Sequence, residues 1–240
     1  MISKSSTAVC VGALGAAVWL GYHAYAPASQ LYGTTISHFR DPHHLGLTFD
    51  DGPNDFYTER LLEILARHEV RATFFLVGKF VQARPHIARA VVAAGHQIGN
   101  HTASHPNLAL LSSRDIRAQL ADASHAIADV TGVIPELFRP PFGARRPGVL
   151  RIARELGLIP VMWDITCYDW RRTSPEKIEN RARRVIEGDR SRGHIVLLHD
   201  GGHTGLGADR SATLAATERL LARYRGSHQF RAVEKADFAV

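Results

Sequence analysis

The sequence predicts an α/β barrel built on parallel strands, and two observations support this fold class. Apolar, strand-like runs alternate with segments of helical periodicity from about residue 45 onward. Such strand–helix alternation is typical of a parallel sheet covered by helices. In addition, polar residues suited to catalysis come directly after the strand-like runs, and barrel enzymes build their active sites at the carboxyl ends of their strands.

The predicted strands are short and apolar, and they cover Leu45–Phe49, Ala72–Val77, His96–Gly99, Leu137–Phe138, Ile159–Trp163 and Ile195–Leu198. Between two of them, apolar residues recur at three- and four-residue steps at Ile116, Leu120, Ala123, Ile127 and Val130, as in a helix that packs on a sheet. Further helices are expected at Tyr57–His68, Phe80–Ala94, Pro147–Leu156, Pro175–Glu187 and Ser211–Tyr224, with Ser211 as an N-cap and Gly95 as a C-terminal stop.

The most informative segment is Leu47-Thr48-Phe49-Asp50-Asp51-Gly52-Pro53, in which an apolar run ends in two adjacent carboxylates and a turn. Neighbouring residues of a strand point to opposite sides, but at a strand end both acids can reach one cleft. Their charge then requires a metal, an arginine or a proton. The alternative is a simple turn at Asp51-Gly52-Pro53 with Asp50 as its cap.

A second segment, Asn100-His101-Thr102-Ala103-Ser104-His105-Pro106, places two imidazoles four residues apart. On a helical turn they would share one face and converge on one cation. Together with Asp51, His101 and His105 form a set of two histidines and one carboxylate that suits Zn²⁺, although other divalent metals fit as well. In a chain with 14 histidines, two unrelated surface histidines are the competing interpretation.

Three further segments contain candidate catalytic or substrate-binding residues. Arg139 lies in the stiff segment Phe138–Gly143, where it would pair bidentately with a carboxylate or serve only to brace the loop. The segment Trp163–Trp170 begins and ends with a tryptophan, and such residues either stack on sugar rings or fill a core. His199 ends an apolar run ahead of two glycines, and an imidazole at such a strand end is a candidate general acid.

Taken in order, five motifs resemble those of the polysaccharide deacetylases, the NodB-homology group or carbohydrate esterase family four. They are Thr48-Phe49-Asp50-Asp51-Gly52-Pro53, His101-Thr102-Ala103-Ser104-His105, Arg139-Pro140-Pro141-Phe142-Gly143, Asp169-Trp170 and Leu197-Leu198-His199. The resemblance extends from about Leu45 to the C-terminus. The occurrence of all five motifs in order is highly specific, and it implies a distorted barrel of about seven parallel strands.

The resemblance also implies a role for each motif residue. Asp50 would be the general base and His199 the general acid. Asp51, His101 and His105 would hold a divalent metal, Zn²⁺ in the first place, with Co²⁺ or another transition metal as alternatives. The remaining roles are a brace for the base (Arg139), an orienting partner for the acid (Asp169), a wall of the substrate groove (Trp170), a lining of the acetyl pocket (Leu197) and an oxyanion contact through a backbone N–H (Phe142).

Two positions depart from the common pattern of the family. Phe142 stands where many members have tyrosine, and a phenylalanine should be tolerated there because the backbone N–H is the group thought to meet the oxyanion. Thr166 stands where the fourth motif often carries an earlier aspartate, so that motif is only half matched. The tuning of His199 is therefore less well defined than its identity.

The implied activity is metal-dependent removal of N-acetyl groups from a GlcNAc-containing polysaccharide, peptidoglycan or a chitin-like glycan, by base-assisted attack of metal-bound water. An alternative enzyme activity is that of an O-acetyl xylan esterase, because the same attack cleaves an ester. An alternative function without catalysis is that of a membrane-tethered glycan-binding protein of the same fold. The intact set of Asp50, Asp51, His101, His105 and His199 argues against that second alternative.

The N-terminal 30 residues carry one charge, Lys4, and are apolar or small from Val9 to Ala26. This pattern predicts a membrane anchor or a signal peptide, and so a protein exported to the cell membrane or secreted. Residues 31–44 are expected to be a linker and residues 45–240 the barrel domain. The net charge of +6 and the short basic clusters, which lack interleaved aromatics, do not favour nucleic-acid binding. No feature points to a protein partner.

Overall fold

The structure, a computed structural model, describes residue 15 and residues 18–238. In this part of the chain the strands form one sheet in the order β1-β8-β2-β3-β4-β5-β6, with β7 beside β8 and β9 beside β2. The strands are β1 (His38–Phe39), β2 (His44–Gly52), β3 (Thr73–Leu76), β4 (Gln97–Asn100), β5 (Leu137–Phe138), β6 (Ile159–Pro160), β7 (Ile165–Thr166), β8 (Gly193–His199) and β9 (Gln229–Phe230).

Strands β2 to β8 all pair in parallel, whereas β1 is antiparallel to β8. The predicted distorted barrel of about seven parallel strands is therefore confirmed. Strands β1, β7 and β9, of two residues each, were not among the strands predicted from the sequence.

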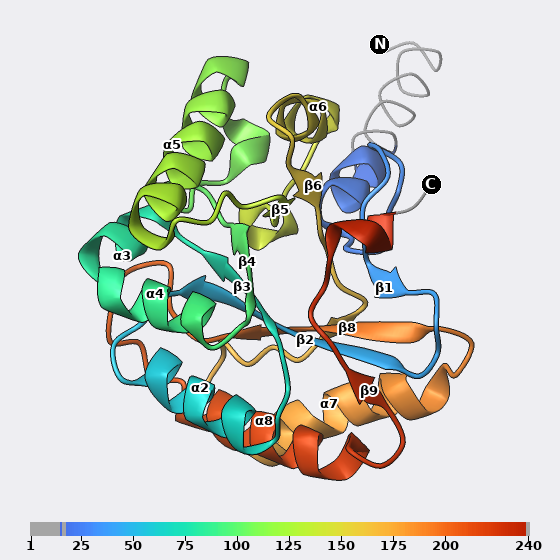
Figure 1. Cartoon of the computed structure of the whole chain (residues 1–240). Coiled ribbons are helices and arrows are strands. Elements are labelled where there is room, and N and C mark those ends of the chain that lie inside the picture. Colours follow the sequence, from blue (N-terminus) through green and yellow to red (C-terminus); the bar gives the residue numbers. More distant parts are fainter. Residues whose placement is uncertain (1–14, 16–17, 239–240) are drawn as a thin grey trace.

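Helices cover the outside of the sheet, with α2 beside α8, α8 beside α7, and α5 in contact with α3, α4 and α6 (Figure 1). Their bounds are α2 (Tyr57–Arg67), α3 (Gly78–Ala83), α4 (Pro85–Ala93), α5 (Ser113–Thr131), α6 (Pro147–Glu155), α7 (Pro175–Gly188) and α8 (Ser211–Tyr224). Short 3₁₀ turns lie at Leu108–Leu110, Pro141–Gly143 and Lys235–Phe238.

Two details of the helices differ from the prediction. The expected helix Phe80–Ala94 is two helices, because Pro85 forces Arg84 out of the helical region and starts α4. Ser211 is the first residue of α8 rather than its N-cap: Arg210 holds that position, and the Ser211 N–H donates to Asp209 Oδ1 at 2.8 Å. Gly95, with a φ of 78°, ends α4 as predicted.

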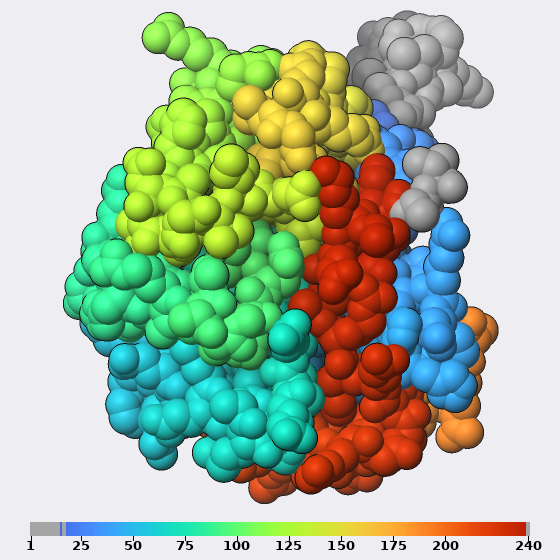
Figure 2. All heavy atoms as spheres, in the orientation of Figure 1, coloured from blue at the N-terminus to red at the C-terminus, as the bar shows by residue number. Residues whose placement is uncertain are grey.

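The buried apolar residues form three clusters, and two of these contain most of the apolar residues of the sheet. One cluster lies between the sheet and the outer helices and includes Leu47, Phe74 and Leu220, and another includes Phe75, Ile195 and Val233. The backbone N–H of Val233 donates to Thr73 Oγ1 at 2.9 Å, at the start of β3. The C-terminal segment, red in Figure 2, thereby lies over the end of β3 at which that strand begins.

The segment ahead of the sheet packs against the barrel. Residues 31–44, expected to be a linker, contain β1, and Ile36 and Phe39 are buried. The buried guanidinium of Arg145 donates to the carbonyls of Ala26 at 2.6 Å and Ser29 at 2.8 Å, and also to the carbonyl of Gly143 at 3.0 Å.

Most of the predicted anchor or signal peptide, residues 1–14 and 16–17, lies outside the described residues. Residue 15 and residues 18–25 are helical. Within the described ranges, no helix is both long enough and apolar enough to cross a membrane.

Close packing inside the barrel predicts a strong effect at Gly99. A Cβ on Gly99 would lie 2.5 Å from the ring of buried Phe75, so Gly99→Ala should lower the free energy of unfolding by about 1–3 kcal/mol, as overpacking does in other cores. Gly188→Ala is the control, because its Cβ would meet nothing within 4 Å. Denaturant unfolding of both variants measures the difference, and equal stabilities would contradict the packing described here.

Candidate active site

The candidate site lies at the carboxyl ends of the strands. Asp50 on β2 is aligned with His199, the last residue of β8. A bulge between Asp50 and Gly52 places Asp51 at a φ of 71°. The extra residue breaks the alternation of a strand and turns the next side chain. Asp50 and Asp51 consequently line the same cavity, although they are neighbours in the chain.

Asp51, His101 and His105 bring one ligand atom each into a cluster whose members lie within 4.8 Å of one another. Asp51 Oδ1 lies 3.1 Å from His105 Nε2 and 3.5 Å from His101 Nε2. All three side chains are buried. The second nitrogen of His101, Nδ1, contacts the carbonyl oxygen of Arg139 at 2.8 Å, which fixes the orientation of that ring.

The expectation that His101 and His105 share a helical turn is wrong. The chain after β4 is irregular, and both Thr102 (φ 70°) and His105 (φ 65°) adopt left-handed conformations that a helix does not contain. The His105 N–H donates instead to Thr102 Oγ1 at 2.9 Å. The two imidazoles meet because this loop turns back on itself, and spacing alone does not show that.

Arg139, fully buried at the end of β5, donates to Asp50 Oδ1 at 2.8 Å and to Thr48 Oγ1 at 2.7 Å. The pairing with Asp50 is not bidentate as expected, because other N–H groups of the guanidinium donate to the carbonyls of Val161 and Met162. Burial lowers the pKa of Arg139, and the charge of Asp50 opposes that shift.

His199 and Asp169 form a second pair on the other side of the cavity. Asp169 Oδ1 lies 2.9 Å from His199 Nδ1, and Asp169 Oδ2 accepts from the His199 backbone N–H at 2.8 Å and from Thr213 Oγ1 at 2.9 Å. Burial acts to lower the pKa of His199, but the Asp169 carboxylate, together with the charges of Asp51 and Asp50, raises it to about 9. The remaining nitrogen, Nε2, therefore carries a proton at neutral pH.

The residues of the first cluster fit a metal ion. Asp51 Oδ1 and His105 Nδ1 are buried without a hydrogen-bond partner in the described structure, although buried polar atoms are normally satisfied. Burial acts to raise the pKa of Asp51, yet the contacts with His101 and His105 hold it well below its usual range. Burial also lowers the pKa of His105. A deprotonated carboxylate and a neutral imidazole are the forms that bind metals.

These groups lie around one cavity of about 510 Å³. Phe142 and Trp170 line it with rings that are 51% and 42% exposed, whereas Leu197 and Trp163 are buried. Trp163 also donates from Nε1 to Thr166 Oγ1 at 2.7 Å. The cavity is lined by Asp50, Asp51, His101, His105, Phe142, Gly143, Trp163, Trp170, Leu197, His199, Gly202, His203, Thr204, Ala208 and Arg210.

His203 was not among the predicted site residues. It stands four residues after His199, in the loop that follows β8, and its ring packs parallel to that of His105 with 4.9 Å between centroids. The signal in the sequence was a further histidine directly after the glycines that end this strand. Thr213, which donates to Asp169 from the first turn of α8, left no comparable signal.

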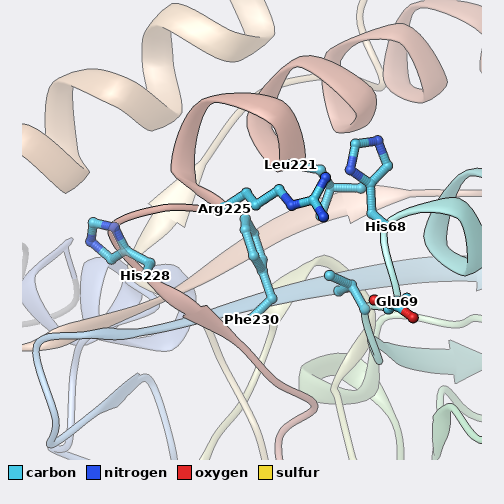
Figure 3. A pocket seen from close by; sticks show the side chains of 7 residues that line it. His68, Glu69, Leu221, Arg225, His228 and Phe230 are labelled. Atoms are coloured by element: carbon cyan, nitrogen blue, oxygen red, sulfur yellow. The ribbon is translucent and has the colours of Figure 1, made fainter.

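A smaller cavity of about 160 Å³ lies at the opposite end of the barrel, where α2 and α8 end (Figure 3). His68, Glu69, Arg225, His228 and Phe230 are among its lining residues. It is lined by none of the motif residues, unlike the cavity of about 510 Å³.

Comparison with known proteins agrees with this geometry. The family model for polysaccharide deacetylases matches residues 39–161, more than half of the chain. The chain belongs to the polysaccharide deacetylase family. The resemblance seen in the motifs is thus confirmed, and so is the expectation of an enzyme of this class.

Individual members of the family are similar over most of their length. A chitooligosaccharide deacetylase from Bradyrhizobium sp. (strain ANU 289) is 37% identical over 71% of this chain and 76% of its own. A peptidoglycan-N-acetylglucosamine deacetylase from Bacillus cereus is 34% identical over 77% of this chain and 63% of its own. Among solved structures, a CE4 family pseudoenzyme from Bacillus anthracis has a TM-score of 0.75 at 31% identity, over 83% of this chain and 67% of its own.

The pair formed by His199 and Asp169 predicts a change in the pH dependence of any reaction that uses His199 as an acid. Asp169→Asn removes the main negative charge that raises the pKa of His199 to about 9, so the imidazole should lose its proton at lower pH. The alkaline limb of kcat against pH should therefore move to lower pH. The comparison is a series of kcat values for wild type and variant from pH 6 to pH 10.

Asp164→Asn is the matched control, because Asp164 pairs with His194 at 2.6 Å in the same manner but neither residue lines the cavity. Its alkaline limb should stay in place. An unmoved limb in Asp169→Asn would show that His199 does not titrate in the reaction.

Proposed function

We propose that this protein is a metal-dependent hydrolase that removes N-acetyl groups from a GlcNAc-containing polysaccharide. The observation that supports the proposal best is the composition of one cavity. It combines the three candidate metal ligands Asp51, His101 and His105 with two groups suited to proton transfer, Asp50 and His199. Base, acid and metal ligands at one site are the requirements of metal-assisted amide hydrolysis.

The proposed metal is Zn²⁺, held by Asp51, His101 and His105, since two imidazoles and one carboxylate are a donor set that zinc accepts while it keeps positions open for substrate. Co²⁺ suits the same donors. When bound, such an ion supplies Lewis acidity, which polarises the acetamide carbonyl and lowers the pKa of water in contact with it.

Asp50 is the proposed general base. Its carboxylate faces the cavity and accepts a hydrogen bond from Arg139, so it is held in one orientation. An ionised carboxylate at this position takes the proton of the attacking water. Arg139 is not itself part of the cavity lining and acts through Asp50.

His199 is the proposed general acid. Asp169 occupies its Nδ1, so Nε2 is the nitrogen left to donate a proton to the departing amine. The raised pKa of about 9 keeps that proton in place at neutral pH until the C–N bond breaks. The products are acetate and a free amino sugar.

The remaining residues of the proposed site bind the substrate. The backbone N–H of Phe142 is the proposed partner of the developing oxyanion. Leu197 lines the pocket for the acetyl methyl group, and the half-exposed ring of Trp170 forms a wall on which a sugar can stack. Asp169 and Arg139 orient the acid and the base.

Peptidoglycan and chitin-like glycans are the proposed substrates, because the named relatives are chitooligosaccharide and peptidoglycan-N-acetylglucosamine deacetylases. Both polymers lie outside the cytoplasm, so the proposal includes export, with residues 1–30 as anchor or signal peptide. An O-acetyl xylan esterase would use the same groups on an ester.

A non-catalytic glycan-binding role is the second candidate, because one similar solved structure is described as a CE4 family pseudoenzyme. Activity assays separate the two. The full chain is stripped of metal with a chelator and resupplied with Zn²⁺ or Co²⁺. Acetate release is then measured on N-acetylglucosamine oligomers, peptidoglycan and acetylated xylan. Metal-restored release from the first two supports deacetylation, release from xylan alone supports the esterase, and binding without release supports the second candidate.

Asp50→Asn should reduce kcat by at least about a hundredfold, the contribution usual for a general base, while Zn²⁺ still binds through the unchanged Asp51, His101 and His105. Acetate release and Zn²⁺ content are measured on the same preparation. Asp55→Asn serves as the control, because Asp55 lies on the surface and pairs with Arg84 away from the cavity. Equal acetate release from Asp50→Asn and wild type would overturn the assignment of the base.

A further inference from the structure

The two candidate histidine ligands are supported in different ways. His101 Nδ1 contacts the carbonyl oxygen of Arg139 at 2.8 Å, whereas His105 Nδ1 is buried without any hydrogen-bond partner in the described structure. A histidine that binds a metal normally uses its second nitrogen to fix the orientation of the ring. His105 lacks this support, so its orientation must be fixed in another way.

Rings surround His105 instead. The ring of His203 stacks on it with 4.9 Å between centroids and 23° between planes. Phe142 meets it edge-on at 4.7 Å and 76°, and His101 meets it at 4.9 Å and 62°. The ring of Phe142 also contacts His203, at 5.5 Å and 78°. A stacked ring on one face and edges around it limit the rotation of an imidazole as a hydrogen bond would.

His203 is held by the loop that carries it, residues 201–210. Lys79 Nζ donates to the carbonyl of His203 at 3.1 Å. Asn54 contacts the loop at two points, donating to the carbonyl of Ala208 at 2.9 Å and accepting from the Gly207 N–H at 2.6 Å. Arg210 donates back to the carbonyl of Gly201 at 2.7 Å. These contacts come from the residues after β2 and from α3, so the loop is tied to the rest of the site.

The position of His203 distinguishes it from a ligand. The cluster of candidate ligands does not include it: its Nδ1 lies 4.0 Å from Asp51 Oδ2, and its side chain is 48% exposed, whereas Asp51, His101 and His105 are buried. Its ring face, rather than a ring nitrogen, meets His105.

We propose that His203 is a positioning residue that keeps His105 in its metal-binding orientation by ring stacking. This inference rests on the metal site of the proposed function and adds a member to it from a loop outside the five motifs. The proposed role requires a planar ring at position 203 but does not require the ring nitrogens.

Zn²⁺ affinity of the metal-free full chain, measured by competition with a chromogenic chelator, tests the proposal. His203→Ala should bind Zn²⁺ at least about tenfold more weakly than wild type, the loss usual when an outer support of a ligand is removed. His203→Phe retains a planar ring and should restore most of the affinity. His125→Ala, which removes an exposed imidazole on α5 away from the cavity, should bind as wild type does.

Kinetics provide a second readout. If His203 acts through His105, saturating Zn²⁺ should return kcat of His203→Ala toward the wild-type value without a change in KM. A raised KM that persists at saturating Zn²⁺ would mean that His203 contacts the substrate instead, and it would overturn the proposal.

Three other results would also overturn it. Equal Zn²⁺ affinities of His203→Ala and wild type would show that the stack supports nothing. Equal losses in His203→Phe and His203→Ala would identify a ring nitrogen as a ligand. Absence of Zn²⁺ binding in wild type itself would remove the metal site, and with it both this inference and the proposed function.

Discussion

The arrangement of the site depends on the buried guanidinium of Arg139. A cation without exposure to water is costly unless it is paired and its N–H groups are bonded. Asp50 supplies the charge, and Thr48 and the carbonyls of Val161 and Met162 accept the remaining hydrogen bonds. The side chain thereby joins β2 to the segment after β6. Because the carbonyl of Arg139 contacts His101, the same residue also connects the carboxylate of Asp50 to the cluster of candidate metal ligands.

Much of this site was predictable because parallel strands place their carboxyl ends at one edge. Apolar runs ending in Asp50, His101 or His199 were sufficient to infer that these side chains meet, and the order of the motifs was sufficient to infer the family. The helices were predictable for a related reason, since burial of one face imposes a period on the sequence, as in α5. The exception is the helix predicted at Phe80–Ala94, which is two helices because Pro85 moves Arg84 out of the helical conformation.

The rest depended on backbone conformations that no periodicity encodes. Asp51, Thr102 and His105 all have positive φ angles, and these angles, rather than a helical face, bring the two imidazoles to the carboxylate. Arg139 forms only one hydrogen bond with Asp50 because its other N–H groups donate to the carbonyls of Val161 and Met162. These acceptors lie more than 20 residues further along the chain. His203 belongs to a loop whose course is set by Asn54 and Lys79, so its stacking on His105 was beyond a reading of the local sequence.

Arg145 ties the site to a part of the chain that precedes the barrel. Its guanidinium is shared between the carbonyls of Ala26 and Ser29 and that of Gly143, in the turn that carries Phe142. Loss of the chain up to Ser29 would remove the carbonyls of Ala26, Pro27 and Ser29 as acceptors of this buried cation and would leave its bond to Gly143. Residues 26–29 are therefore part of the support of the turn that carries Phe142, a residue of the cavity lining, although they lie far from it in the chain.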